Sequence, residues 1–301
     1  MGLGVTQSPR RLRMVSAPQR HEARFRHQAR FILVLAATLA GALAAYATAN
    51  GYAEFTPVMV AIAAVPLLGG LIGLWRLMAA WEAGPGRAHA VLAAFSLALV
   101  SWSITLLVYL IELARGSELL EFPSVVDIPN YASALFWTIG VWLLYEGGVD
   151  DYLEEVKENS YFLTLIALLC FFVLTIAEGN DYGRLLRSGD DLAKRVTEAL
   201  LPLAWGVNGF MLYRAGRGQL GKRLRGERTA VRALAFGLSL AFVSDLLFAA
   251  GASLLIRDPA NVLAYRNGGL ADSLAMVAYL FLAFGVLYFP LDAPLFHPAD
   301  A

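Results

Sequence analysis

Residues 230–256 read AVRALAFGLSLAFVSDLLFAAGASLLI, and apart from Arg232 near the start and Asp245 near the middle the run carries no charge. A hydrocarbon layer about 30 Å thick is crossed by about 20 residues of helix, so this run is long enough to span a bilayer. We therefore expect a transmembrane helix here, with one carboxyl group at depth.

Seven other apolar runs of comparable length accompany it, at 31–50, 57–81, 88–114, 128–145, 161–177, 197–213 and 271–290. Across all 301 residues, 58% are hydrophobic and 16% are charged. Soluble domains average about 45–50% apolar and about 25% charged residues, so both values indicate lipid as the solvent. The sequence predicts an all-α, polytopic membrane helix bundle of eight transmembrane helices.

Lysine and arginine are distributed unevenly between the connections. With the N-terminus inside, 17 of the 24 fall on the inner side and 7 on the outer side; Arg76 and Arg87 are counted with the inner connection between the second and third runs. Because basic residues accumulate on cytoplasmic loops, this distribution predicts a multi-pass protein of the plasma membrane with both ends in the cytoplasm.

Two kinds of residue suit the membrane surfaces. The basic runs at 10–30 and 214–232 match anionic lipid headgroups, and nothing beside them indicates nucleic-acid binding. Aromatic rings near the ends of the apolar runs are typical of an interface belt. These rings are Trp75, Trp81, Tyr145, Tyr161, Tyr213, Tyr288 and Phe289.

The third and fourth runs resemble the seventh and eighth. SLALVS at 96–101 matches SLAFVS at 239–244, and LFWTIGV at 135–141 matches LFLAFGV at 280–286. We interpret this as a parallel 4+4 tandem duplication, with repeats at 31–147 and 161–290, an acidic connecting loop at 148–160, and tails at 1–30 and 291–301. The alternative is chance agreement between helices that are all rich in Leu, Ala and Phe.

Asp245 is the most unusual residue of the apolar runs. A carboxyl group at this depth costs at least about 2.5–3.5 kcal/mol unless it faces protein or water, so it is a candidate ligand or ion site. The alternative is a neutral aspartic acid that hydrogen-bonds across helices to Asn208, Ser101 or Ser103. Its counterpart in the first repeat is Trp102, so any site built there is asymmetric.

Other polar residues extend the list of candidates. Asn208, beside Gly206 and Gly209, is a second polar group at depth, and Pro66 and Pro202 interrupt the second and sixth runs. The ligand or ion candidates are Asp245, Asn208, Ser101, Ser244 and Trp102. The outer-face carboxylates Asp127, Asp272, Glu112 and Glu178 are candidates for a cation or ligand site, although Asp127 and Asp272 also suit helix capping.

Catalytic and cofactor motifs are absent from the sequence. It has no phosphate-binding loop, no zinc-protease pattern, no pair of cysteines and no nucleophile elbow. The single cysteine, Cys170, excludes an internal disulfide, and no lysine lies within an apolar run. The sequence therefore predicts no cofactor, no metal site and no catalytic residue.

The segment around the fourth run carries a resemblance to a known class of protein. Pro123, Ser124, Asp127 and Tyr131, followed by Gly140, resemble the multi-span N-terminal sensory modules of bacterial diguanylate cyclases and histidine kinases. The second repeat keeps only LAD at 270–272 and Gly285. The resemblance implies a membrane-sensing role, and a separate protein would have to supply the output domain.

Three functions are compatible with these features. The first is a sensory or accessory membrane protein that acts through helix contacts with a membrane or cytoplasmic protein partner. The second is a transporter of a small molecule or ion that uses Asp245. The third is an intramembrane enzyme that modifies lipid with its outer-face carboxylates. The sequence leaves the oligomeric state open.

Overall fold

The computed structural model describes residues 57–80, 86–114, 127–146, 152–177, 189–217, 228–257 and 269–291. The first predicted span, both terminal tails and most of the connecting loops lie outside these ranges. Among the predicted site residues, Glu178 also lies outside them.

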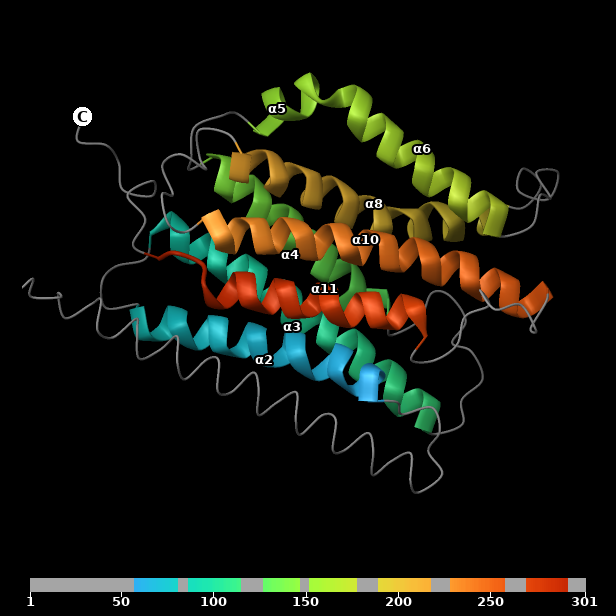
Figure 1. Ribbon diagram of the computed structural model, residues 1–301, viewed down its shortest axis with the longest axis horizontal. Helices are drawn as coiled ribbons and strands as arrows, with labels where there is room; N and C mark the ends of the chain where they lie inside the picture. The colour runs from blue at the N-terminus through green and yellow to red at the C-terminus, as the bar shows by residue number, and fades with distance from the viewer. Residues whose placement is uncertain are drawn as a thin grey trace, which may run out of the picture.

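The described part of the chain is helical, with no strand in it. The helices are α2 (Pro57–Ala80), α3 (Arg87–Ala114), α4 (Asp127–Glu146), α5 (Tyr152–Glu158), α6 (Ser160–Ala177), α8 (Gly189–Arg217), α10 (Arg228–Arg257) and α11 (Leu270–Leu287) (Figure 1). Each predicted span from the second to the eighth therefore coincides with a helix. Two boundaries were wrong: α8 begins at Gly189 instead of Thr197, and the predicted loop at 148–160 contains α5.

Four of the described helices are long and apolar enough to cross a membrane. Their spans are Met59–Ala80, Arg87–Glu112, Thr229–Gly251 and Leu270–Leu287, and a shorter apolar helical stretch covers Ser160–Cys170. Helices α4, α6 and α8 are not among the four. The chain is thus a membrane protein whose described part is all helical, as its composition predicts.

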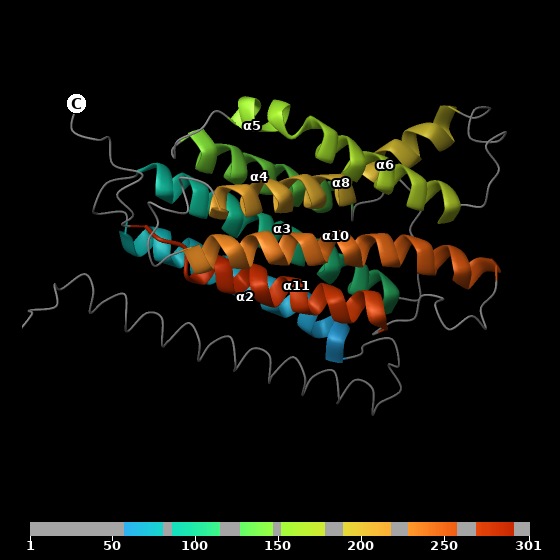
Figure 2. The same ribbon diagram turned by 45° about the horizontal axis from the view of Figure 1, so that its top comes forward.

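The helices pack in two similar groups. In one group α3 lies between α2 and α4, and in the other α10 lies between α8 and α11. Contacts of α11 with α2 and of α4 with α8 join the groups, and α6 packs against α8 and α10. Figures 1 and 2 show α2 and α6 at opposite edges of the bundle.

Glycines bring α2 and α8 close to their neighbours. Both helices carry the pattern P-L-x-x-G-x-x-G, at 66–73 in α2 and at 202–209 in α8. A Cβ atom on Gly73 would collide with Ser96 of α3, and a Cβ on Gly209 would lie 3.1 Å from Ser239 of α10. Neither Pro66 nor Pro202 ends its helix. Small residues at these positions let the helix backbones approach one another.

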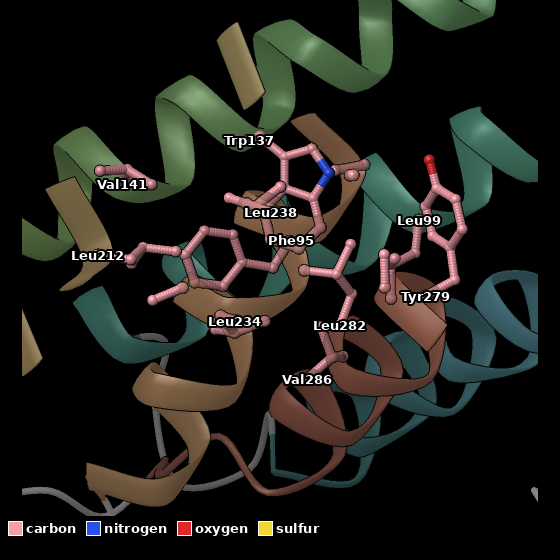
Figure 3. Close-up of a cluster of buried hydrophobic side chains, with 14 of the residues drawn as sticks. Phe95, Leu99, Trp137, Val141, Leu212, Leu234, Leu238, Tyr279, Leu282 and Val286 are labelled. Atoms are coloured by element: carbon pink, nitrogen blue, oxygen red, sulfur yellow. The ribbon is translucent and has the colours of Figure 1, made fainter. Parts of the chain in front are cut away.

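Large side chains fill the space between the two groups (Figure 3). Phe95 of α3 lies 5.0 Å from Trp137 of α4 and 5.8 Å from Phe289, measured between ring centroids. Two rings that we predicted for the membrane interface, Tyr145 and Phe289, are buried instead. The hydroxyl of Tyr145 donates a hydrogen bond to the backbone oxygen of Met211 on α8, at 2.7 Å.

Arg76 is a buried cation inside α2, so its assignment to a cytoplasmic connection was wrong. Its guanidinium donates to the backbone oxygens of Val286, Leu287 and Phe289, at 2.7–2.9 Å. The last carbonyls of a helix have no partner within the helix and carry the negative end of its dipole. Arg76 therefore satisfies the C-terminal end of α11 and ties it to α2.

Candidate functional site

Asp245 lies near the middle of α10, and side chains from three other helices surround it. Its carboxylate interacts electrostatically with Tyr279 of α11 and with Cys170 of α6. It also lies beside the indole N–H of Trp205 on α8. Cys170, Trp205 and Tyr279 are each buried, whereas Asp245 itself is partly buried. The predicted carboxyl group at depth is therefore enclosed mainly by aromatic and apolar groups.

Trp102 of α3 completes an aromatic cluster next to Asp245. Its ring stacks on Tyr279 with 5.1 Å between centroids, and it meets Trp205 edge to face at 6.0 Å. In Figure 3 the hydroxyl of Tyr279 points away from Leu282 and Val286 of the same helix. Four helices, α3, α8, α10 and α11, thus each contribute one member to a group of three rings and one carboxylate.

Both indoles of this cluster have buried N–H groups without a hydrogen-bond partner. The N–H of Trp205 lies near the Asp245 carboxylate, but the two do not form a fully aligned hydrogen bond. Buried donors in proteins are almost always paired, and an unpaired one costs about 1–3 kcal/mol. One such donor beside the Asp245 carboxylate, and a second on the ring that packs against Trp205 and Tyr279, mark this part of the bundle as a candidate binding site.

The other predicted polar candidates hold helices together instead of contacting Asp245. Asn208 donates to the hydroxyl of Thr138 at 3.0 Å, and its own side-chain oxygen is buried without a partner. Ser244 donates to the backbone oxygen of Ala271 at 2.9 Å. Each bond joins two helices, α8 to α4 and α10 to the start of α11.

The proposed hydrogen bonds from Asp245 to Asn208, Ser101 or Ser103 are not formed. Ser103 donates within α3 to the backbone oxygen of Leu99 at 2.9 Å. The backbone oxygen of Ser101 accepts from Thr105 at 3.2 Å. The structural alternative for Asp245, a carboxyl group bonded to these three side chains, was therefore wrong about its partners.

The outer-face carboxylates lie at the helix ends opposite to Arg76. Asp127 is the first residue of α4, Asp272 lies in the first turn of α11, and Glu112 is close to the end of α3. The N-cap residue of α11 is Gly269, and Asp272 follows it in the first turn of the helix, so Asp272 is not the N-cap residue itself. Among the described residues, no three His, Cys, Asp or Glu side chains come together as a metal site.

Sequence reasoning found Asp245 and Trp102 but missed Trp205, Tyr279 and Cys170. Helices that are apolar on every side give no pattern that tells which face meets which neighbour. One signal was available for Trp205, because it precedes Gly206 inside the P-L-x-x-G-x-x-G pattern of α8. Tyr279 and Cys170 carry no comparable signal.

The residues behind the resemblance to sensory modules are described only in part. Pro123 and Ser124 lie outside the described ranges, and Asp127 begins α4. Gly140 packs against Phe95, so closely that an added Cβ would collide with that ring. No protein-family model matches this chain, and neither a curated protein nor a solved structure matches it.

Proposed function

We propose that this protein carries a monovalent cation, a proton included, across the membrane and that Asp245 is the group that binds it. The single observation that carries the proposal is the position of this carboxylate. It lies in the middle of an apolar helix, beside the rings of Trp205 and Tyr279, and has no ion pair among the described residues. Ionisable groups at such depth mark ion pathways and proton relays in membrane proteins.

A tandem duplication of the bundle supports this proposal. A spacing of 136 residues relates Pro66 to Pro202, Gly70 to Gly206 and Gly73 to Gly209. The second glycine of each pattern lies against the first serine of the matching SLALVS or SLAFVS segment. Contacts of α2 with α11 have their counterpart in contacts of α8 with α4. We infer eight spans in two parallel repeats, with both ends in the cytoplasm and the plasma membrane as the location.

The proposed repeats carry different residues at the candidate site. The SLALVS and SLAFVS match pairs Asp245 with Trp102, the 136-residue spacing pairs Trp205 with Gly69, and the LFWTIGV and LFLAFGV match pairs Tyr279 with Ala134. Gly69 packs against Ala283, whereas Trp205 adds a ring to the aromatic cluster. Such differences at an interior cluster are expected when one repeat has gained a binding site and the other has not.

Interrupted helices also support a transport function. Pro66 and Pro202 occupy equivalent positions in α2 and α8, and Pro202 lies one turn before Trp205. Paired Gly- and Pro-interrupted segments at corresponding positions of two repeats are pointers to transporter binding sites. We therefore expect α8 to move when the occupant of Asp245 changes.

The test is charge movement by the full-length protein in proteoliposomes on a solid-supported membrane. A step to lower pH should give a transient current in the wild type because Asp245 binds a proton within the membrane field. Asp245→Asn should abolish that current while eluting as the same monodisperse species. The matched control is Glu146→Gln, which removes an exposed carboxylate at the end of α4 and should leave the current unchanged. Equal currents in wild type and Asp245→Asn would overturn the proposal.

A sensory role remains a second proposal, because Asp245 interacts with α6, a helix that exposes several large apolar side chains. Cys170 of α6 interacts with Asp245, while Tyr161, Leu165 and Leu168 of the same helix are exposed. A change of occupant at Asp245 would therefore act on α6, and a partner helix could detect it. Binding at Asp245 without any sustained flux of the bound ion would favour this role over transport.

A further inference from the structure

We infer that the Asp245 site takes an organic ammonium ion, a positively charged nitrogen carrying alkyl groups. This inference rests on the proposed function and names its substrate class. It follows from the juxtaposition of one carboxylate, Asp245, with the rings of Trp102, Trp205 and Tyr279 and with the apolar side of α6.

The ligand set is poorly suited to a hard metal ion. Calcium takes six to eight oxygen ligands, and magnesium demands near-octahedral oxygen coordination. The groups that interact with Asp245 are one indole, a phenol and a thiol, and a second indole packs on the first two, so the described part of the site supplies one carboxylate and few other oxygens. A sodium ion would meet the same shortage of oxygens.

The aromatic cluster suits a cation of low hydration. A cation within about 6 Å of an aromatic centroid is attracted to the ring face, and tryptophan gives the strongest attraction. Trp102 and Trp205 meet edge to face, so the positive edge of one ring already occupies the negative face of the other. An ammonium ion beside Asp245 can take the place of that ring edge against the ring face. The carboxylate of Asp245 then balances its positive charge.

The side of the site toward α6 suits alkyl substituents. Ile166 and Cys170 of α6 pack with Leu246, the residue after Asp245, and Phe242 and Leu203 lie against them. These groups offer no hydrogen bond to a hydrated ion but can contact methyl or methylene groups. Binding would exchange one cation for another: the proton of the carboxyl group passes to water as the ammonium ion enters, so the charge of the site is unchanged.

The unpaired indole N–H of Trp205 is suited to the exchange of a proton for an ammonium ion at Asp245. Its buried N–H lies beside the carboxylate without full hydrogen-bond geometry. Once the carboxylate is ionised, this N–H can donate to one of its oxygens while the ammonium ion contacts the other. Trp205 would then contribute both a donor and a ring face, which makes it the most informative residue to change.

The experiment measures binding of tetramethylammonium to the full-length protein in lipid nanodiscs, by proton release in weak buffer and by tryptophan fluorescence. Sodium chloride at equal ionic strength serves as the reference salt. We expect saturable binding to the wild type, loss of binding in Asp245→Asn, and binding about 10-fold weaker in Trp205→Leu because one ring face is removed. Trp142→Leu is the matched control, since it deletes an exposed indole of α4 and should bind as the wild type does.

Two further measurements separate the possible failures. Trp205→Phe keeps a ring and should bind more tightly than Trp205→Leu, which guards against a folding defect in the latter. The pH-step current should persist in both Trp205 variants because Asp245 is intact. A wild type that gives the current but binds tetramethylammonium no better than sodium would overturn the ammonium inference and leave the proposed function standing. A wild type that gives neither the pH-step current nor tetramethylammonium binding would overturn the ammonium inference and the proposed function together.

Discussion

Arg76 and Asp245 are charged residues within apolar helices, and their surroundings differ sharply. Arg76 donates to three backbone oxygens at the end of α11, so its charge serves to join two helices. Asp245 faces aromatic rings and has no ion pair among the described residues. The first residue is expected to govern stability, and the second is expected to govern binding.

Arg76→Gln should lower the free energy of unfolding by about 3 kcal/mol, because hydrogen bonds from a charged donor contribute about 1.5–3 kcal/mol each and the shorter side chain cannot form all three. Denaturation in mixed micelles, followed by circular dichroism, measures the change. Arg87→Gln is the control. Arg87 is exposed and pairs with the exposed Glu146 at 3.9 Å, so its loss should cost less than about 1 kcal/mol. Equal losses would contradict the role assigned to Arg76.

Tyr145→Phe should destabilise the contact between α4 and α8 by about 1 kcal/mol, because it leaves the buried backbone oxygen of Met211 without its donor. The same mixed-micelle assay detects the loss. Tyr213→Phe removes a hydroxyl from an exposed ring that lies 5.0 Å from the Arg217 guanidinium carbon, and it should be neutral. A neutral Tyr145→Phe would show that the hydrogen bond adds nothing to the interface.

Sequence reasoning at this scale identified the unusual residue but not its neighbours. Asp245 was recognisable because charge is rare in apolar runs, and Trp102 because of the repeat alignment. Trp205, Tyr279 and Cys170 were not recognisable, since their identity as neighbours depends on how four helices rotate about their axes. Arg76 was misplaced because positive charge is usually found at span ends, whereas here backbone oxygens of another helix solvate it.

At the scale of helices, close approach depends on glycine. A Cβ on Gly69 would lie 2.7 Å from the Cβ of Ala283 and 3.1 Å from its Cα, with no flexible atom to give way. Gly216 in the last turn of α8 has only ordinary contacts, at 3.5 and 3.7 Å. The same substitution, glycine to alanine, can therefore be compared at a crowded position, Gly69, and at an uncrowded one, Gly216.

Gly69→Ala should lower the free energy of unfolding by about 1–3 kcal/mol, because overpacking forces α2 away from α11. Gly216→Ala should instead be neutral or stabilising by up to about 1 kcal/mol, since alanine favours a helix more than glycine does. Thermal unfolding of both variants in the same detergent gives the comparison. The close-packing interpretation fails if Gly69→Ala is as stable as the wild type.

The positions of the helices were largely predictable from hydropathy. Every described helix that corresponds to a predicted span begins within two residues of it except α8, whose polar first turns at 189–196 give no apolar signal. The helix α5 was missed because YLEEVKE is polar and short. Hydropathy measures suitability for lipid, so it detects neither kind of segment.

At the scale of the whole molecule, the contacts between the two proposed repeats predict that the chain can be divided. Residues 1–147 and 148–301, co-expressed as separate chains, should assemble in the membrane, because α2 with α11 and α4 with α8 provide contacts between them. Co-purification through a tag on one half, followed by the pH-step current, measures assembly and function. Adding Gly69→Ala to the first half should weaken assembly. Failure of the unmodified halves to co-purify would contradict the two-repeat organisation.

The bond between Arg76 and α11 has a consequence for biosynthesis. The ribosome adds the 210 residues between Arg76 and Val286 in about 10–40 s at about 5–20 residues per second. During that interval the Arg76 guanidinium lacks its final acceptors. A translation product that stops before Val286 should therefore stay bound to the translocon and be degraded by membrane quality control. The completed chain should leave the translocon once α11 packs against α2.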